Sequence, residues 1–366
     1  MHCSSVPEMT KTNPSFPNSF PSLYKILALE TISSLKSNSF TFFASLATNT
    51  IFIISIMISN FINMKVKALV LFSGGLDSLL AAKILLEQNI QVVGLVFKSY
   101  FFDEKQAKKF VRQLKIPLKI INFGKEHLEI VKNPKYGYGK GINPCIDCRL
   151  LMLKKAKELM QKENFNFVAT GEVLGERPFS QNKKALELIE KESSLKGYLL
   201  RPLSAKLLPK TIPEEKGWVK REKLFEIKGR RRKKQIDLAK KFGLEYPQPS
   251  GGCILTDLIF SKKLKELLEM KKDIGKNDVE LLKVGKHFWF DGIKVVLGRN
   301  EKENKKIEKL SKKKDVLIKP KFPGPTALIR VYKGKVSKNL IRKVKKLIKD
   351  YSKKAKLRSK FEVIFV

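Results

Sequence analysis

The sequence predicts an α/β protein in which a parallel sheet carries helices on both faces and a small α+β domain follows. Two observations predict the sheet. Apolar runs of strand length alternate with segments of helical spacing from residue 64 onward, and a glycine-rich loop joins the first run to the first helix. A third observation predicts the second domain, because the composition shifts to Lys, Glu and Leu after Phe260.

The first strand, loop and helix are the best-defined part of the pattern. Val66–Phe72 is an apolar run, Ser73–Ser78 reads SGGLDS, and Leu79–Gln88 carries apolar residues at helical spacing. Glycines let backbone N–H groups approach a ligand closely, and the positive end of the helix favours phosphate oxygens. Neither a G-K-[ST] triplet nor a G-x-G-x-x-G pattern is present here. The alternative is a simple glycine turn that Asp77 or Ser78 caps.

The alternation continues for another hundred residues. The expected elements are a strand at Gln91–Phe97, a helix at Glu104–Leu114, a strand at Leu118–Asn122, a helix at Arg149–Lys162 and a strand at Phe165–Thr170. Ligands bind at the carboxyl ends of parallel strands. The SGGLDS loop and Thr170-Gly171-Glu172 both follow strands, so we expect them to lie together.

Cysteine is rare, which argues against a disulfide scaffold and favours a reducing compartment. Cys145 and Cys148 form a C-x-x-C pair after a polar loop, Cys253 lies in another glycine-rich turn, and Cys3 is far from both. The pair is compatible with a redox disulfide or with half of a zinc or iron–sulfur site. Three cysteines without a fourth suit a [4Fe–4S] cluster with one open iron, or a persulfide-carrying thiol with a resolving partner.

The charge balance indicates a polyanionic partner. The 366 residues include 75 Lys and Arg against 35 Asp and Glu, a formal charge of +40. A lysine-rich solvated surface is the alternative. One basic run precedes a helical pattern, where positive charge is unfavourable for the helix dipole. We therefore expect RNA-backbone contacts from Arg230, Arg231, Arg232, Lys233 and Lys234.

Residues 1–63 differ from the rest of the chain. They carry few charges, and Phe42–Ile62 is apolar enough to span a bilayer. One interpretation is a membrane anchor. The other, which we favour, is an extension upstream of an authentic start at Met64 that is not part of the mature fold. This second interpretation predicts a cytoplasmic protein without stable membrane association.

We expect residues 64–270 to form the first domain and residues 271–366 a basic second domain. His287–Gly298 reads as a hairpin around Asp291-Gly292, and Arg299–Asn304 opens a helix. A turn and strand at 324–330 and a basic helix at Ser337–Tyr351 follow. The second domain is predicted to bind RNA, with a dimerisation domain as the alternative. A homodimer is compatible with either interpretation.

The SGGLDS loop closely resembles the SGGxDS signature of the PP-loop ATP pyrophosphatases, which have a Rossmann-like, adenine nucleotide α-hydrolase-like fold and cleave ATP between the α and β phosphates. The resemblance implies an ATP site that consists of Ser73, Gly74, Gly75, Leu76, Asp77, Ser78 and Gly171. Asp77 would position phosphate or Mg²⁺.

Further motifs resemble the tRNA thiouridine synthases over residues 64–260. The segments CRLLM (148–152), ATGEVLG (169–175), Ser180-Gln181 and LRPL (200–203) are similar to 4-thiouridine synthases, whereas Pro-Cys-x-x-Cys is closer to 2-thiouridylases. GRNEKEN (298–304) resembles the RNA-binding domain of ribosome-quality-control factors.

These resemblances imply that ATP activates a uracil carbonyl oxygen of tRNA, which sulfur then replaces. Asp77, Cys145, Cys148 and Cys253 would be the catalytic residues, and the three cysteines would bind a cluster or carry sulfur. The donor would be a cysteine desulfurase or sulfide. Two alternatives remain, namely a PP-loop ligase or amidotransferase for a small molecule, and an RNA-binding factor with a regulatory nucleotide site.

Overall fold

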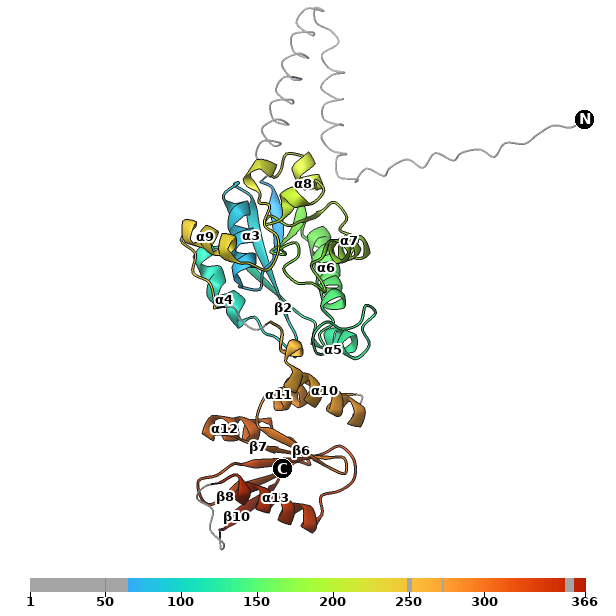
Figure 1. Cartoon of the computed structure of the whole chain (residues 1–366), viewed down its shortest axis with the longest axis vertical. Coiled ribbons are helices and arrows are strands. Elements are labelled where there is room, and N and C mark those ends of the chain that lie inside the picture. The colour runs from blue at the N-terminus through green and yellow to red at the C-terminus, as the bar shows by residue number, and fades with distance from the viewer. Residues whose placement is uncertain (1–49, 51–64, 249–251, 272, 353–358) are drawn as a thin grey trace, which may run out of the picture. The chain divides into compact units, whose positions relative to one another are not determined.

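The computed structural model describes residue 50 and residues 65–366 except 249–251, 272 and 353–358 (Figure 1). The chain divides into two compact units, Met1–Lys65 and Val66–Val366, and the second is described below. The expected extension at 1–63 lies outside the described residues, apart from Thr50. Within the described part, none of the helices combines the length and apolar character that crossing a membrane requires.

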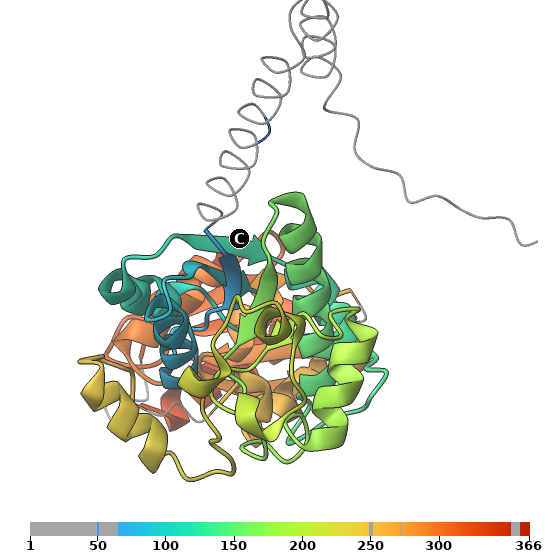
Figure 2. The same cartoon turned by 90° about the horizontal axis from the view of Figure 1, so that it is seen from above.

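The first sheet is wholly parallel, as the sequence predicts, in the order β3-β2-β1-β4-β5. Its strands are β1 (Lys67–Leu71), β2 (Gln91–Lys98), β3 (Leu118–Asn122), β4 (Phe167–Thr170) and β5 (Leu199–Leu200). Figure 2 shows β1 in blue beside β4 in green, and Leu71 pairs with Thr170 at their carboxyl ends. The strand order reverses at β1, which creates a crevice where ligands bind in such sheets.

Helices cover both faces of this sheet because side chains alternate along β1. Ala68 and Val70 pack in the same core cluster as α3 and α9, whereas Leu69 and Leu71 pack with α6 and α7. The helices of this region are α3 (Leu76–Leu86), α4 (Lys105–Val111), α5 (Gly124–Lys132), α6 (Cys145–Lys162), α7 (Lys183–Glu192), α8 (Ile212–Glu215) and α9 (Lys233–Lys241).

One expected boundary is wrong in a way that affects the site. The helix predicted from Arg149 begins at Cys145, so both cysteines of the C-x-x-C pair lie in the first turn of α6. Pro144 precedes it as the N-cap residue. The polar loop before this motif hides the start of the helix in the sequence.

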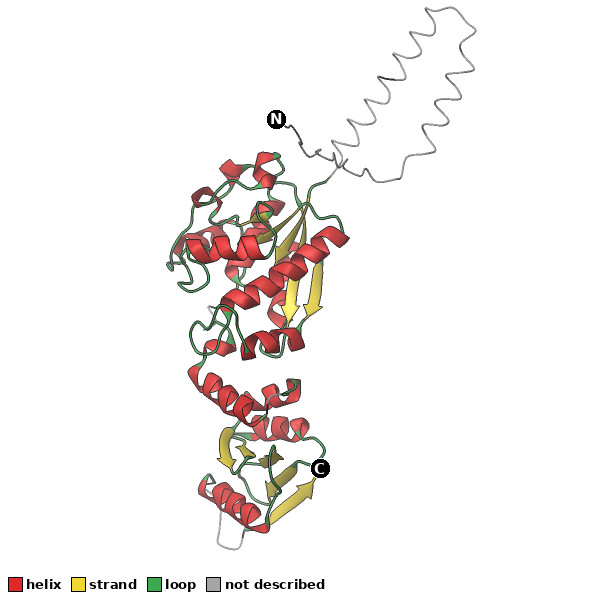
Figure 3. Ribbon diagram, turned by 90° about the vertical axis from the view of Figure 1, so that its right-hand side faces the viewer, coloured by secondary structure: helices red, strands yellow, loops and turns green. Residues whose placement is uncertain are grey.

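The second sheet has the order β10-β8-β9-β7-β6 and is antiparallel (Figure 3). Its strands are β6 (Lys286–Phe290), β7 (Ile293–Leu297), β8 (Val316–Pro320), β9 (Ala327–Val331) and β10 (Phe361–Phe365). The expected hairpin is confirmed, since Asp291 and Gly292 both have positive φ, at 45° and 82°.

The helices of this region also divide between the two faces of the sheet. α13 (Lys338–Asp350) packs on the face that carries Val295, whereas α12 (Glu301–Leu310) packs on the face that carries Val296. Two more helices, α10 (Leu258–Met270) and α11 (Lys276–Leu282), precede β6. Leu281 of α11 packs with Val296.

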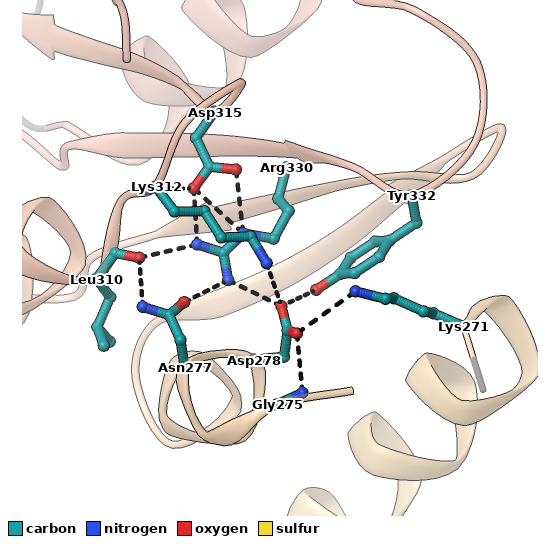
Figure 4. Close-up of polar contacts among 9 residues, drawn as sticks. All are labelled: Lys271, Gly275, Asn277, Asp278, Leu310, Lys312, Asp315, Arg330 and Tyr332. Atoms are coloured by element: carbon teal, nitrogen blue, oxygen red, sulfur yellow. Dashed lines mark hydrogen bonds and ion pairs between the residues drawn. The ribbon is translucent and has the colours of Figure 1, made fainter. Parts of the chain in front are cut away.

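A buried arginine binds α11 to the second sheet (Figure 4). Arg330 of β9 is 1% exposed and donates to the Asp315 carboxylate, with Nη2 2.6 Å from Oδ2. It also donates to Asn277 and Asp278 of α11, at 2.8 and 3.1 Å. The Tyr332 hydroxyl donates to Asp278 as well. A guanidinium with this many partners offsets much of its desolvation cost.

Candidate nucleotide and sulfur site

The SGGLDS loop leaves the carboxyl end of β1 and enters α3 through Gly74 and Gly75. Gly74 has a φ of +76°, and Gly75 is the N-cap residue of α3. The Gly75 N–H donates to Ser73 Oγ at 3.3 Å, and Ser78 Oγ donates to the Gly75 carbonyl at 2.9 Å. Among the described residues, no side chain caps the start of α3. The positive end of the helix is therefore available to an anion.

Two glycines are required by close packing around this loop. A Cβ on Gly74 would lie 2.7 Å from the backbone of Gln106 and Ala107. A Cβ on Gly171 would lie 2.5 Å from the carbonyl carbon and oxygen of Asp77. The loop after β4 therefore contacts the SGGLDS loop directly, as the strand order predicts.

The Asp77 carboxylate is only partly satisfied by its neighbours. Arg232 donates to Oδ2 at 3.3 Å, while Oδ1 is buried without a hydrogen-bond partner among the described residues. Burial raises the pKa of Asp77, and Arg232 and Arg177 oppose that rise only in part. Burial and the nearby Asp77 likewise raise the pKa of Glu176. Such perturbed carboxyl groups are typical of functional sites.

The basic run divides into two kinds of residue. Arg230, Arg231, Lys233 and Lys234 are exposed, which is compatible with the predicted RNA contacts. Arg232 instead points to Asp77 and so belongs to the surroundings of the SGGLDS loop. Gln235, in the first turn of α9, is fully buried, and its amide has no hydrogen-bond partner in the described part of the chain.

The three core cysteines come from two segments whose backbones pair. Ile142 N donates to the Leu255 carbonyl at 3.1 Å, and a Cβ on Gly141 would lie 2.5 Å from that oxygen. This contact brings the Cys253 segment beside the loop that leads to Cys145. Asp147, between the paired cysteines, accepts from two backbone N–H groups of that loop, at 3.0 and 3.1 Å.

Cys145, Cys148 and Cys253 have free thiols, and their charges interact with one another. Burial raises the pKa of all three thiols, that of Cys253 to about 11. Cys253 and Cys145 raise the pKa of Cys148 further, while Arg149 opposes the rise. In the described ranges, no three or more His, Cys, Asp and Glu side chains form a group that could hold a metal ion.

A buried ion-pair cluster connects the cysteine helix to the loop after β4. Glu172 is 2% exposed and lies 3.0 Å from Arg149 Nε and 3.1 Å from Arg201 Nε. Although burial alone would raise it, these two guanidinium groups hold the pKa of Glu172 below its usual value. Because Arg149 follows Cys148 and Glu172 follows Gly171, the cluster fixes the start of α6 relative to the loop after β4.

Arg177 is the residue that sequence reasoning missed. Burial raises the pKa of Asp77, Cys145 and Cys253, and the positive charge of Arg177 opposes that rise in all three. Its charge therefore acts on both the SGGLDS loop and the thiols. The sequence offers little signal for this role, because Arg177 is one basic residue among many. Only the folded chain brings its charge near both groups.

The parallel sheet, the SGGLDS loop at the switch point and the uncapped start of α3 agree with the Rossmann-like fold of the PP-loop class. Comparison with known proteins agrees. Residues 63–206 match the family model for the thiamine biosynthesis protein ThiI, and residues 285–365 match the NFACT protein RNA binding domain. The predicted resemblance to PP-loop tRNA thiouridylases with a C-terminal RNA-binding domain is confirmed.

Curated proteins similar to this chain include tRNA-specific 2-thiouridylases. That of Karelsulcia muelleri is 29% identical over 229 residues, which cover 58% of this chain and 57% of that protein. That of Chloroflexus aurantiacus is 30% identical over 176 residues, 42% and 48% of the two chains. The chain thus spans about half the length of the curated relatives it matches.

Among solved structures, a 4-thiouridine synthetase–RNA complex with bound ATP has a TM-score of 0.31 and 23% identity. It covers 37% of this chain and 36% of that one.

Proposed function

We propose that the protein is an ATP-dependent tRNA uridine thiolase. The observation that carries the proposal is the contact between the SGGLDS loop and the cysteine helix: a Cβ on Gly171 would lie 2.5 Å from the Asp77 backbone, and the next residue, Glu172, pairs at 3.0 Å with Arg149, which follows Cys148. A loop of phosphate-binding type and a set of cysteines held close to it suit a reaction that first uses ATP and then transfers sulfur. The matches to ThiI and to the 2-thiouridylases support the same reaction class.

In the first step the uracil carbonyl oxygen attacks the α phosphorus of ATP, and pyrophosphate leaves. Ser73, Gly74, Gly75, Leu76 and Ser78 would hold the pyrophosphate through the loop N–H groups and hydroxyls. Arg232 would stabilise the charge that develops on the leaving phosphates. Oδ1 of Asp77, which has no hydrogen-bond partner in the described ranges of the chain, would bind a magnesium ion, which offsets phosphate charge. Adenylation converts a poor leaving oxygen into a good one.

In the second step sulfur replaces the activated oxygen. A persulfide on one cysteine attacks the uracil carbon, and AMP leaves with the oxygen. A second cysteine thiolate then attacks the carrier's Sγ, which releases the thiouridine and forms a disulfide between the two cysteines. The outer sulfur is reduced and the two cysteines are oxidised, so a thiol reductant must restore the enzyme. A cysteine desulfurase, or sulfide with an oxidant, would reload the persulfide.

The three cysteines match the donor set of a [4Fe–4S] cluster with one open iron. However, they do not form a metal-holding group in the described part of the structure. We therefore derive no step through a cluster. Iron and acid-labile sulfide content of the purified protein would decide between the two sulfur carriers.

The test is nucleoside mass spectrometry of tRNA from cells with and without the gene. One thiouridine should disappear on deletion, and its isomer would identify position 2 or position 4. The intact gene should restore it, whereas Asp77→Asn and Cys145→Ser should not. Cys3→Ser is the matched control and should restore it fully. Persistence of every thiouridine in the deletion strain would contradict the proposal.

A further inference from the structure

The second domain contains a hollow of about 750 Å³ that no step of the proposed reaction uses. It lies between the start of α12 and the loop before β9, and Lys286 and Tyr351 line it from the sides. A volume of this size matches the pockets that hold small ligands and exceeds what a free phosphate ion fills.

Side-chain contacts build the wall of the hollow. Asn304 Nδ2 donates to the Gly324 carbonyl at 3.1 Å, and its Oδ1 accepts from Thr326 N at 3.0 Å. A Cβ on Gly298 would lie 2.0 Å from that Oδ1, so only glycine fits there. The loop before β9 is thereby held against α12, which makes the hollow a fixed feature of the fold.

The chemistry of the lining combines an aromatic ring with cations. Tyr351 is 47% exposed, and Lys286 Nζ lies 4.2 Å from its ring centroid. Glu303 holds Arg299 by ion pairing, yet 56% of the Arg299 side chain stays exposed. The opposing charge in the lining is Glu301, whose carboxylate is paired with Lys305 at 2.5 Å.

We propose that this hollow binds one unpaired nucleotide of an RNA strand. Its base stacks on Tyr351 in place of the Lys286 ammonium that covers this ring in the structure, and Lys286 moves to the phosphate beside Arg299. Base–aromatic stacking with adjacent cations is how proteins bind single strands, whereas a paired base has both faces covered by its neighbours. The proposal rests on RNA as the partner of this domain, and it does not depend on the thiolation chemistry.

The experiment measures fluorescence anisotropy of the full chain with a labelled hexauridine and with a blunt RNA duplex. Tyr351→Leu should weaken hexauridine binding by about tenfold, because stacking is lost. Duplex binding should change by less than twofold. Tyr351→Phe keeps the ring and should bind hexauridine as tightly as the parent chain. Thermal unfolding of each variant would show that it is folded.

Matched controls come from the same domain. Phe365→Leu removes a ring that is 70% exposed and does not line the hollow, so it should leave hexauridine affinity unchanged. Lys286→Gln should weaken binding, whereas Lys335→Gln, an exposed lysine elsewhere, should have a smaller effect.

Three results would overturn the inference: equal hexauridine affinities for Tyr351→Leu and Phe365→Leu, equal losses on hexauridine and duplex, or loss of binding in Tyr351→Phe. Competition by uridine monophosphate at an affinity equal to that of hexauridine would reassign the hollow to a free nucleotide. Cys145→Ser should leave hexauridine binding intact, so failure of the thiolase proposal is distinguishable from failure of this one.

Discussion

The carboxylates of Asp77 and Glu172 have opposite environments, although both residues adjoin Gly171, Glu172 in the sequence and Asp77 through its backbone. Both oxygens of Glu172 lie within ion-pair distance of an arginine, and its pKa is lowered. Asp77 has one arginine contact, through Oδ2, while its Oδ1 has neither a hydrogen bond nor an ion pair within the described residues, and its pKa is raised. The comparison indicates that Glu172 stabilises the fold around the site, whereas Asp77 lacks partners that a ligand would supply.

The largest expected effect is on the stability that Glu172 provides. Glu172→Gln would leave Arg201, which is 3% exposed, with Glu190 as its remaining charged partner, and would leave Arg149 without its carboxylate. Loss of one partner in a buried ion pair costs about 3–5 kcal/mol, so urea should unfold the variant at a much lower concentration. Glu187→Gln, at an exposed position on the same domain, is the control and should change stability by less than about 0.5 kcal/mol. Similar losses in both variants would contradict the role given to Glu172.

A smaller effect is expected at Gly171, which packs against the Asp77 backbone and precedes Glu172. Gly171→Ala would place a methyl group 2.5 Å from the Asp77 backbone, so the SGGLDS loop must shift. Misplacement of a phosphate site by about 1 Å can cost roughly a hundredfold in rate, and we expect that loss in tRNA-dependent pyrophosphate release. Gly275→Ala has no atom within 4 Å of the new Cβ and should keep the parental rate. A parental rate in Gly171→Ala would show that the close contact does not position the loop.

The smallest expected effect is the change in the free energy of unfolding when Asp77 is replaced. Its dependence on pH distinguishes Asp77 from Glu172. The pKa of Asp77 is raised by folding, so its ionised form opposes folding at neutral pH. Asp77→Asn should therefore be as stable as the parent at pH 7 or slightly more so, and the difference should vanish as pH falls below 3.8.

Glu172 should show the opposite dependence on pH. Its folded pKa is lowered, so its advantage over Gln should be complete above 4.5 and be lost as the pH falls through the folded pKa. Urea titrations of the parent and both variants from pH 3 to 7 would test this contrast. Parallel curves for the two variants would contradict it.

The sequence predicts the parts of this site that follow from local pattern. SGGLDS lies between an apolar run and a helical pattern, and the parallel strand order brings Gly171 to the same edge. Asp291-Gly292 predicts its hairpin because both positions need positive φ. Long-range side-chain contacts have no such signal. Arg232 contacts Asp77 across 155 positions, and its role was hidden among similar basic residues.

Elements that depend on tertiary packing also escaped prediction. β5 contains only two residues, too few for an alternating pattern, and forms because it pairs with β4. The start of α6 at Cys145 was missed because glycine- and lysine-rich sequence precedes it.

The Arg330 cluster has a consequence for dissecting the chain into fragments. The match to the NFACT protein RNA binding domain begins at residue 285. Arg330 donates to Asn277 and Asp278, which lie before residue 285. A fragment that begins at 285 would retain the arginine and lose two of its anchors. The smallest piece to be expressed alone, or to be transplanted onto another enzyme by gene fusion, therefore includes α11.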